Sequence, residues 1–230
     1  MDAELIEGKA LSYVLVKPRG ASLAESYPLV VLLHGFGANM HDLAGLAPAI
    51  DSEGYVYAFP NAPYLIQLGA GAHGYSWSRG MPGQPGPPGD AADVDELLGG
   101  FLAEVTARTG AQAGRIVLGG FSQGGGLALR YGLPRPETFA GLAVLSGFFR
   151  DAEALRPHLP AERDQAIFVA HGRFDPMIGL EQARQTKGFL EGLRYRLAYH
   201  EYDMAHEVSE AVINDLTPWL HETLPPAILG

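Results

Sequence analysis

Gly-Gly-Phe-Ser-Gln-Gly-Gly-Gly, residues 119–126, is the stretch that decides the fold, because it joins a strand-like run to a helix-like run. Residues 116–118 before it read Ile-Val-Leu, as in a buried parallel strand, and residues 127–130 after it read Leu-Ala-Leu-Arg, as in a helix. A serine at such a sharp turn needs neighbours without side chains two positions away on either side, and Gly120 and Gly124 meet that need. Ser122 is therefore the candidate nucleophile.

Hydrophobic runs on both sides of this stretch predict strands and helices in alternation. Further strands are expected at residues 11–16, 29–33, 55–59, 139–145, 166–170 and 195–202, the first of them antiparallel. Further helices are expected at 42–50, 152–158, 180–193 and 208–219, the last kinked or interrupted by Pro218. Alternating strands and helices imply an α/β fold with a mainly parallel central sheet, covered by helices on both faces.

The clearest helix in the pattern follows Asp90, which can cap it. Its apolar residues recur every three or four positions and form one buried stripe: Val94, Leu97, Leu98, Phe101, Leu102 and Val105.

Composition limits the classes of function. A chain of 230 residues that is 47% hydrophobic can bury a large core, and we expect one domain over residues 1–230. The net charge of -10 argues against a nucleic-acid partner and disfavours anionic membranes. No cysteine is present, which rules out disulfides, thiolate metal sites and a thiol nucleophile. With no signal peptide and no apolar run that could span a bilayer, a cytoplasmic location without stable membrane insertion is expected.

Residues 62–90 are crowded with Gly and Pro and are expected to form an irregular loop without regular elements. The loop is nevertheless too apolar for a solvated linker, so we expect it to pack over the active site. It would line an acyl groove there, together with Phe148 and Phe149 from the loop after strand 139–145. The residues expected to contact substrate are Tyr64, Leu65, Ile66, Leu68, Trp77 and Phe149. The alternative is that the loop folds against the sheet and merely completes the core.

Two other predicted strand ends supply the groups that a serine nucleophile requires. A serine hydroxyl needs a base to take its proton, and a carboxylate must hold that base in one tautomer. Asp175 follows the strand that ends at Ala170, and His206 follows the strand that ends at Tyr202. The chain order Ser122, Asp175, His206 is that of nucleophile-elbow hydrolases.

Alternatives exist for each of these partners. Asp203 is close to His206 in sequence and could orient it, but Asp175 is favoured because a separate strand end brings a carboxylate to the far imidazole nitrogen. His34 and His171 precede glycines in strand-end loops and are expected to hydrogen-bond those loops in place. A metal cluster could instead involve the polar residues near the end of the last strand, but strand alternation spreads them over both faces, so no metal site is predicted. This alternative would use His200, Glu201, Asp203, His206 and Glu207.

The chain resembles the α/β hydrolases, and among them the carboxylesterase and phospholipase family that includes acyl-protein thioesterases. The resemblance lies in Leu-Leu-His-Gly-Phe-Gly at 32–37, Pro-Asn-Ala-Pro at 60–63, Gly-Phe-Ser-Gln-Gly-Gly at 120–125, His-Gly-Arg-Phe-Asp-Pro at 171–176 and Ala-His-Glu at 205–207. It implies an α/β hydrolase fold without a large cap domain and a triad of Ser122, Asp175 and His206. It also implies an oxyanion hole made by the backbone N–H groups of Phe36 and Gln123.

Two departures separate residues 62–90 from that family. The loop lacks the Trp-Phe-Asp run often seen there and reads Tyr-Ser-Trp-Ser-Arg at 75–79, so acyl-chain preference is not carried over. Its Gly/Pro-rich end, residues 81–89, has no counterpart in the family pattern.

The function expected from the sequence is a serine carboxylesterase that cleaves short- to medium-chain carboxylic esters through an acyl-enzyme and needs no cofactor. A lysophospholipase or acyl-thioesterase would use the same triad, and so would an acyltransferase in which another acceptor outcompetes water. A binding protein that has lost catalysis is disfavoured because all three triad positions are intact. The expected partner is a small-molecule ester, and the protein would act as a monomer or homodimer.

Overall fold

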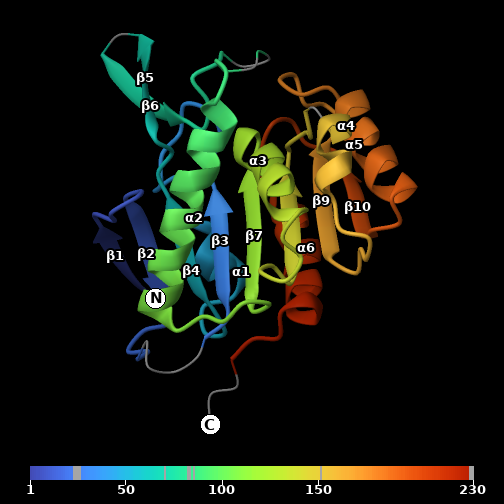
Figure 1. Ribbon diagram of the computed structural model, residues 1–230. Helices are drawn as coiled ribbons and strands as arrows, with labels where there is room; N and C mark the ends of the chain where they lie inside the picture. The colour runs from blue at the N-terminus through green and yellow to red at the C-terminus, as the bar shows by residue number, and fades with distance from the viewer. Residues whose placement is uncertain (23–26, 70, 82–83, 85, 151, 228–230) are drawn as a thin grey trace.

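A computed structural model describes every residue of the chain except 23–26, 70, 82–83, 85, 151 and 228–230. Strands and helices alternate along most of it (Figure 1). The strands are β1(Asp2–Ile6), β2(Tyr13–Lys17), β3(Leu29–Leu33), β4(Val56–Pro60), β5(Tyr64–Gly69), β6(Ala72–Ser76), β7(Ile116–Phe121), β8(Gly141–Leu145), β9(Ala166–Gly172) and β10(Arg196–Tyr202). The helices are α1(Leu46–Ile50), α2(Asp90–Thr109), α3(Gln123–Gly132), α4(Ala152–Leu155), α5(Leu180–Gly192) and α6(Glu210–Thr223), with a 3-10 turn η1(Arg156–His158) after α4.

Eight of the strands form one central sheet in the order β1-β2-β4-β3-β7-β8-β9-β10. The pairs from β4 to β10 are parallel, whereas β1 with β2 and β2 with β4 are antiparallel. The predicted mainly parallel sheet with an antiparallel early strand is therefore confirmed. Because the parallel strands run in one direction, the loops after β3, β7, β9 and β10 leave the sheet at the same edge. The arrowheads of β3 and β7 mark this edge in Figure 1.

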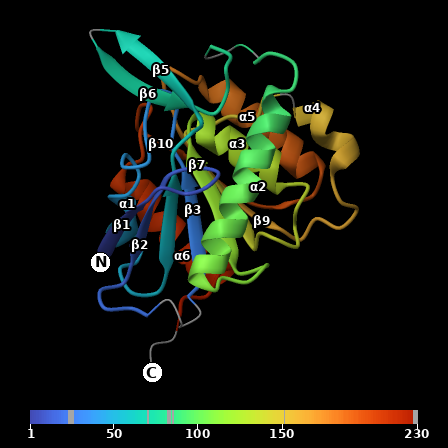
Figure 2. The ribbon, with the colours of Figure 1, turned by 60° about the vertical axis from the view of Figure 1, so that its left-hand side comes forward.

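Side chains along the central strands alternate between two hydrophobic cores. In β3, Leu29, Val31 and Leu33 face the core that α2, α3 and α5 cover, while Val30 and Leu32 face the core that α1 and α6 cover. Successive strand residues point to opposite faces, so an unbroken aliphatic run is what a sheet buried on both faces requires. Figures 1 and 2 show the two helical layers on either side of the sheet.

The structure corrects four expectations about individual elements. Strand β1 was not predicted; it lies at the sheet edge with four of its five residues exposed, so its hydrophobic pattern is weak. Residues 42–45 are turns, and the first helix begins only at Leu46. Asp90 is not the N-cap of α2, because Gly89 occupies that position with φ 89°, which favours glycine. Pro218 lies inside α6 without interrupting it.

Residues 62–90 are not irregular throughout, which is a further correction. Strands β5 and β6 form an antiparallel hairpin, and Gly69 at the end of β5 and Gly71 just before β6 both have positive φ. The hairpin base joins the loop after β3, because Gly37 N donates to Tyr75 O at 2.9 Å and Tyr75 N donates to Ala38 O at 2.9 Å. The prediction for the Gly/Pro-rich end of the segment falls partly outside the described residues.

The hairpin stands beyond the edge of the sheet at which the parallel strands end (Figures 1 and 2). In the described part of the chain, no domain-sized insertion covers this edge. A search for helices that could cross a membrane found none among these same residues, since each is too short or too polar.

Candidate active site

Ser122 lies at the tip of a strained turn between β7 and α3. Its backbone has φ 54° and ψ -116°, a conformation that non-glycine residues rarely adopt. A Cβ atom on Gly120 would collide with the main chain of Gly124, and a Cβ on Gly124 would collide with the carbonyl oxygen of Leu33. The two glycines are thus required for the close approach of strand and helix, as the sequence predicted.

The structure brings Ser122, His206 and Asp175 into one hydrogen-bonded chain. His206 Nε2 lies 3.0 Å from Ser122 Oγ, and His206 Nδ1 lies 2.7 Å from Asp175 Oδ2. The imidazole ring also packs against the ring of Phe121, with centroids 4.8 Å apart. With Nδ1 donating its proton to the carboxylate, Nε2 is left as an acceptor aimed at the serine hydroxyl.

Asp175 is held by its own loop. Its side chain is fully buried, and Oδ1 accepts hydrogen bonds from the backbone N–H groups of Met177 and Ile178 at 2.8 and 2.9 Å. The alternative partner, Asp203, is exposed and pairs with Arg173 at 2.6 Å. Of the two carboxylates considered from the sequence, only Asp175 contacts His206.

His34 and His171 hold strand-end loops, which confirms their predicted place. His34 is buried, its Nδ1 lies 2.7 Å from Gly35 O, and its Nε2 accepts the N–H of Ala62 at 3.0 Å. Burial lowers the pKa of the His34 imidazole below its ordinary value. His171 Nε2 donates to Ile178 O at 2.8 Å and lies 3.5 Å from Asp175 Oδ2, so His171 supports the Asp175 loop.

Phe36 and Gln123 both lie close to Ser122, in the chain or through a neighbour, and both have free main-chain donors. In the described residues, neither backbone N–H donates to a protein acceptor. Gln123 directly follows the serine, and a Cβ on Gly35, the neighbour of Phe36, would lie 3.3 Å from the Ser122 Cβ. Two unpaired N–H groups beside a serine can receive an oxygen that gains negative charge.

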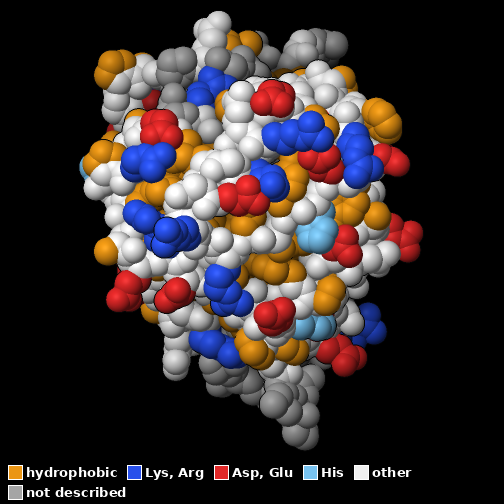
Figure 3. All heavy atoms as spheres, turned by 90° about the vertical axis from the view of Figure 1, so that its right-hand side faces the viewer, with side chains coloured by type: hydrophobic (Ala, Val, Ile, Leu, Met, Phe, Trp, Pro, Cys, Tyr) orange, Lys and Arg blue, Asp and Glu red, His pale blue; other side chains and the backbone are white. Residues whose placement is uncertain are grey.

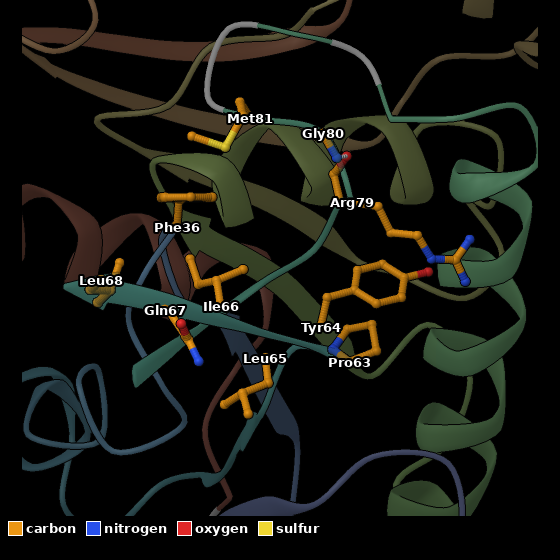
Figure 4. Close-up of a pocket in the computed structure, with 11 residues that line it drawn as sticks. Phe36, Pro63, Tyr64, Leu65, Ile66, Gln67, Leu68, Arg79, Gly80 and Met81 are labelled. Atoms are coloured by element: carbon orange, nitrogen blue, oxygen red, sulfur yellow. Dashed lines mark hydrogen bonds between the residues drawn. The ribbon is translucent and has the colours of Figure 1, made fainter. Parts of the chain in front are cut away.

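An open pocket of about 540 Å³ lies between the hairpin and the loop after β3 (Figure 4). Four of the predicted substrate contacts line it together with Phe36, namely Tyr64, Leu65, Ile66 and Leu68. Figure 4 shows Ile66 and Phe36 directed into the same space, whereas Leu65 turns to the other side of its strand. The side chain of Phe36 thus lines the pocket, whereas the sequence had pointed only to its backbone N–H as an oxyanion-hole donor.

Trp77 and Phe149, the other two predicted substrate contacts, are not part of this lining. Trp77 is 4% exposed, and its indole Nε1 donates to the carbonyl oxygen of His34 at 2.9 Å. Phe149 is 5% exposed and packs edge-on against Phe189, while its N–H donates to Thr186 Oγ1 at 3.0 Å. Both side chains belong to the hydrophobic core under α2, α3 and α5.

Sequence reasoning missed the polar contacts that anchor the segment after the hairpin. The Gln123 side chain receives the N–H of Trp77 at 3.1 Å and donates to Ser76 Oγ at 3.1 Å. Asp90 accepts from Ser78 Oγ at 2.7 Å and from Arg79 N at 3.1 Å. The one signal available was the Ser-Trp-Ser-Arg run at 76–79, polar residues in an otherwise apolar segment.

Arg79, Met81 and four other residues complete the pocket lining without having been predicted. The guanidinium of Arg79 stacks on the Tyr64 ring at 4.6 Å and pairs with Asp93 at 3.0 Å, so its charge is balanced by acidic residues of α2. The remaining four are Pro63, Gln67, Ser78 and Gly80.

Comparison with known proteins places these observations in a family. The sequence profile of the Phospholipase/Carboxylesterase family matches residues 21–224. The acyl-protein thioesterase 1 of Neurospora crassa is 33% identical, over 89% of this chain and 95% of that protein. The acyl-protein thioesterase 1 of Gibberella zeae is 27% identical, over 86% of this chain and 91% of that protein.

Solved structures share the fold. The esterase PE8 superposes with a TM-score of 0.76 at 25% identity, covering 91% of this chain and 99% of its own. The carboxylesterase from Mesorhizobium loti superposes with a TM-score of 0.76 at 20% identity, covering 96% of this chain and 99% of its own, which is evidence for the fold alone. Because the family profile spans most of the sequence, the chain belongs to the phospholipase/carboxylesterase family of α/β hydrolases, which are serine hydrolases that act on ester bonds.

Proposed function

We propose that this protein is a serine carboxylesterase that hydrolyses short- to medium-chain carboxylic esters through an acyl-enzyme on Ser122. The observation that carries the proposal is the chain of contacts from Ser122 Oγ to His206 at 3.0 Å and from His206 to Asp175 at 2.7 Å. One α/β hydrolase domain, residues 1–230, carries the activity, and the chemistry needs no cofactor.

Acylation begins when His206 Nε2 takes the proton of the Ser122 hydroxyl as Oγ attacks the ester carbonyl. The imidazolium that forms is stabilised by Asp175, whose second oxygen is already fixed by two backbone N–H groups. Collapse of the tetrahedral intermediate breaks the bond to the alcohol, which receives its proton from Nε2. A water molecule then attacks the acyl-enzyme while His206 Nε2 takes its proton. Collapse of the second tetrahedral intermediate breaks the bond to Ser122 Oγ, which receives the proton from Nε2, and the acid is released.

The oxyanion of each tetrahedral intermediate would be bound by the backbone N–H groups of Phe36 and Gln123. Neither donates to a protein acceptor in the described residues. Phe36 lies in the loop after β3 and Gln123 is the first residue of α3, and both segments are held by hydrogen bonds to the hairpin or to the chain just after it. Tyr75 O and Ala38 O hold the loop of Phe36 against β6, while the Gln123 side chain is tied to Ser76. Donors fixed before reaction stabilise developing charge without the cost of reorientation.

The acyl chain would lie in the pocket between Phe36 and the hairpin. A volume of about 540 Å³ suits a small apolar ligand. The wall is open, because Leu68 and Met81 are 49% and 65% exposed. An open wall buries a chain only in part, which favours short and medium chains over long ones.

A neutral acyl group fits the charge of the site better than an anionic one. Arg79, the cation of the lining, is paired with Asp93 and close to Asp90. On the side of the molecule formed by α5 and β10, basic and acidic side chains are interspersed (Figure 3). Arg184 of α5 pairs with Glu201 of β10 at 2.8 Å. Together with the net charge of -10, this supports a small ester substrate over a polyanion.

An acyl-thioesterase is the second candidate, because the relatives from Neurospora crassa and Gibberella zeae are named acyl-protein thioesterases. Thioester cleavage would use the same acyl-enzyme and differ only in the leaving group. A panel of matched oxygen esters, thioesters and lysophospholipids, each at several acyl lengths, separates the candidates by their kcat/KM values.

Covalent labelling tests the proposal directly. A fluorophosphonate should label the protein at one site, mapped by peptide mass spectrometry to Ser122, and ester hydrolysis should be lost in proportion. Ser122→Ala should abolish both labelling and turnover, whereas Ser209→Ala should preserve both, because Ser209 is the half-buried N-cap of α6 and its side chain makes no cap hydrogen bond. Turnover retained by Ser122→Ala, or a label at another residue, would refute the assignment.

A further inference from the structure

Ser146 has an unusual backbone conformation next to the active site. It directly follows β8 and has φ 47°, and in the described residues only Ser122 and Arg194 share a positive φ without being glycine. Its side chain is fully buried. A strained residue of this kind persists when its surroundings fix it, and such residues concentrate at functional sites.

Ser146 lies where three active-site segments meet. Its N–H donates to Ala170 O at 2.8 Å, in the strand β9 that leads to Asp175. The carbonyl before it, Leu145 O, accepts the N–H of Ser122 at 2.9 Å. The residue after it, Gly147, approaches the nucleophile turn so closely that a Cβ there would lie 2.8 Å from Ser122 O.

The Ser146 hydroxyl reaches the segment that carries His206. Its Oγ donates to Glu207 O at 2.9 Å. In the described part of the chain, no other hydrogen bond involves the main chain of residues 206–208, which lie between β10 and α6 and have no regular structure. Ser146 therefore combines a positive φ with a hydroxyl that donates to the residue directly after His206.

We propose that Ser146 is a positioning residue: its hydroxyl holds the main chain at Glu207 and so sets the distance between His206 Nε2 and Ser122 Oγ. The inference rests on the proposed role of His206 as the base. Rate depends steeply on such distances, because a displacement of about 1 Å can cost about 100-fold. Without the tether, the segment around His206 keeps its contact with Asp175 but loses its fixed connection to β8.

Two variants separate the hydrogen bond from the backbone strain. Ser146→Ala removes the hydroxyl and keeps a side chain at positive φ, whereas Ser146→Gly removes the hydroxyl and relieves the strain. Both should lower kcat by about 10- to 100-fold and leave KM within about twofold, since the pocket contains no residue of this turn. Ser146→Gly should unfold at a higher temperature than Ser146→Ala. Because the two variants should lose similar kcat despite this difference in stability, the loss of kcat cannot be explained by destabilisation.

Arg194→Gly is the matched control. Arg194 also has a positive φ, 63°, but it is exposed and lies between α5 and the start of β10, the end of that strand away from the active site. Its replacement should relieve similar strain and keep kcat within about twofold of wild type.

The results that would overturn the positioning role of Ser146 differ from those that would overturn the proposed function. Wild-type kcat in Ser146→Gly, with or without a loss in Ser146→Ala, would overturn the positioning role, because a variant that lacks the hydroxyl would then keep the full rate. A loss that appears in KM and not in kcat would overturn it as well. Failure of the proposed function shows differently: the wild-type protein would not be labelled at Ser122, or Ser122→Ala would remain active.

Discussion

His206 Nε2 lies 3.0 Å from Ser122 Oγ, although 84 positions separate the two residues in the chain. Strands β7 and β10, which lead to them, are not neighbours in the sheet, because β8 and β9 lie between them. The loop after β10 therefore crosses back over the carboxyl edge to reach the serine. The sheet topology therefore brings the two residues together, and replacing either one should cause a similar loss of activity.

Ser122→Ala, His206→Ala and the double variant should lose similar amounts of activity. Residues that act as a unit are not additive, and loss of either member of a triad costs on the order of 10³ to 10⁶ in kcat. Steady-state kinetics on one ester, with thermal unfolding to confirm the fold, provides the measurement. A double variant with a loss equal to the product of the two single losses would mean that the residues act independently.

Acid should destabilise the protein through His34. Burial lowers the pKa of His34 in the folded state, so the unfolded chain takes up a proton that the folded chain resists. The contribution of His34 to the free energy of unfolding is thus fully present above 6.5, the pKa of histidine in the unfolded chain, and declines as the pH falls below that value. A protonated imidazole could also no longer accept the N–H of Ala62.

The difference between wild type and His34→Gln isolates this contribution. The free energy of unfolding, measured with denaturant at pH 8 and pH 5.5, should fall less on acidification in His34→Gln than in the wild type. Equal falls in the two proteins would show that other groups cause the acid sensitivity.

Gln123 allows the oxyanion donor to be removed with little change to the fold. It is the first residue of α3, a position where proline is tolerated because the N–H has no partner within the helix. Gln123→Ala loses the side-chain contacts to Ser76 and Trp77 but keeps the N–H, whereas Gln123→Pro loses both. Relative to Gln123→Ala, Gln123→Pro should lose a further 10²- to 10³-fold in kcat, or about 2.7 to 4 kcal/mol.

That comparison requires both Gln123 variants to unfold at similar temperatures, since proline also restricts the backbone of Ser122. Equal kcat values in the two variants, with both folded, would show that the backbone N–H of Gln123 does not stabilise the oxyanion.

The nucleophile turn and the three candidate triad residues could be predicted because each carries a local signal. Gly120 and Gly124 are needed for steric reasons that act over four residues, and Asp175 and His206 each follow an apolar strand. The choice of Asp175 over Asp203 followed from the reasoning that a separate strand end reaches the far imidazole nitrogen.

The hairpin and the pocket could not be predicted in the same way. The Gly and Pro content of residues 62–90 outweighed the strand signal in β5, whose apolar side chains are largely exposed. Apolarity also failed to separate Trp77, which completes the core, from Ile66, which lines the pocket. That distinction depends on how the hairpin docks on the loop after β3, a long-range relationship that no local pattern records.

Trp77→Ala should lower stability without changing chain-length preference. The indole is buried beside His34, at 5.4 Å between ring centroids, and donates to its carbonyl oxygen. Loss of a buried tryptophan costs about 3 to 5 kcal/mol. Unfolding by denaturant measures the loss, and the ratio of hexanoyl to acetyl ester hydrolysis should stay at the wild-type value. A changed ratio would place Trp77 in contact with the substrate after all.

Ile66→Ala should weaken the preference for longer acyl chains. Each fully buried methylene contributes about 0.8 kcal/mol, which is roughly a fourfold change in rate, and a half-exposed wall reduces this to about twofold. In the wild type, kcat/KM should therefore rise about two- to fourfold per added carbon from acetyl upward and then level off where the pocket ends. Because Ile66 points toward Phe36 in the pocket, its truncation should flatten that rise (Figure 4).

Leu5→Ala is the control, since Leu5 is 53% exposed on β1 at the far edge of the sheet and should leave the series unchanged. A flat wild-type series, or the same slope in Ile66→Ala and wild type, would show that the acyl chain lies elsewhere.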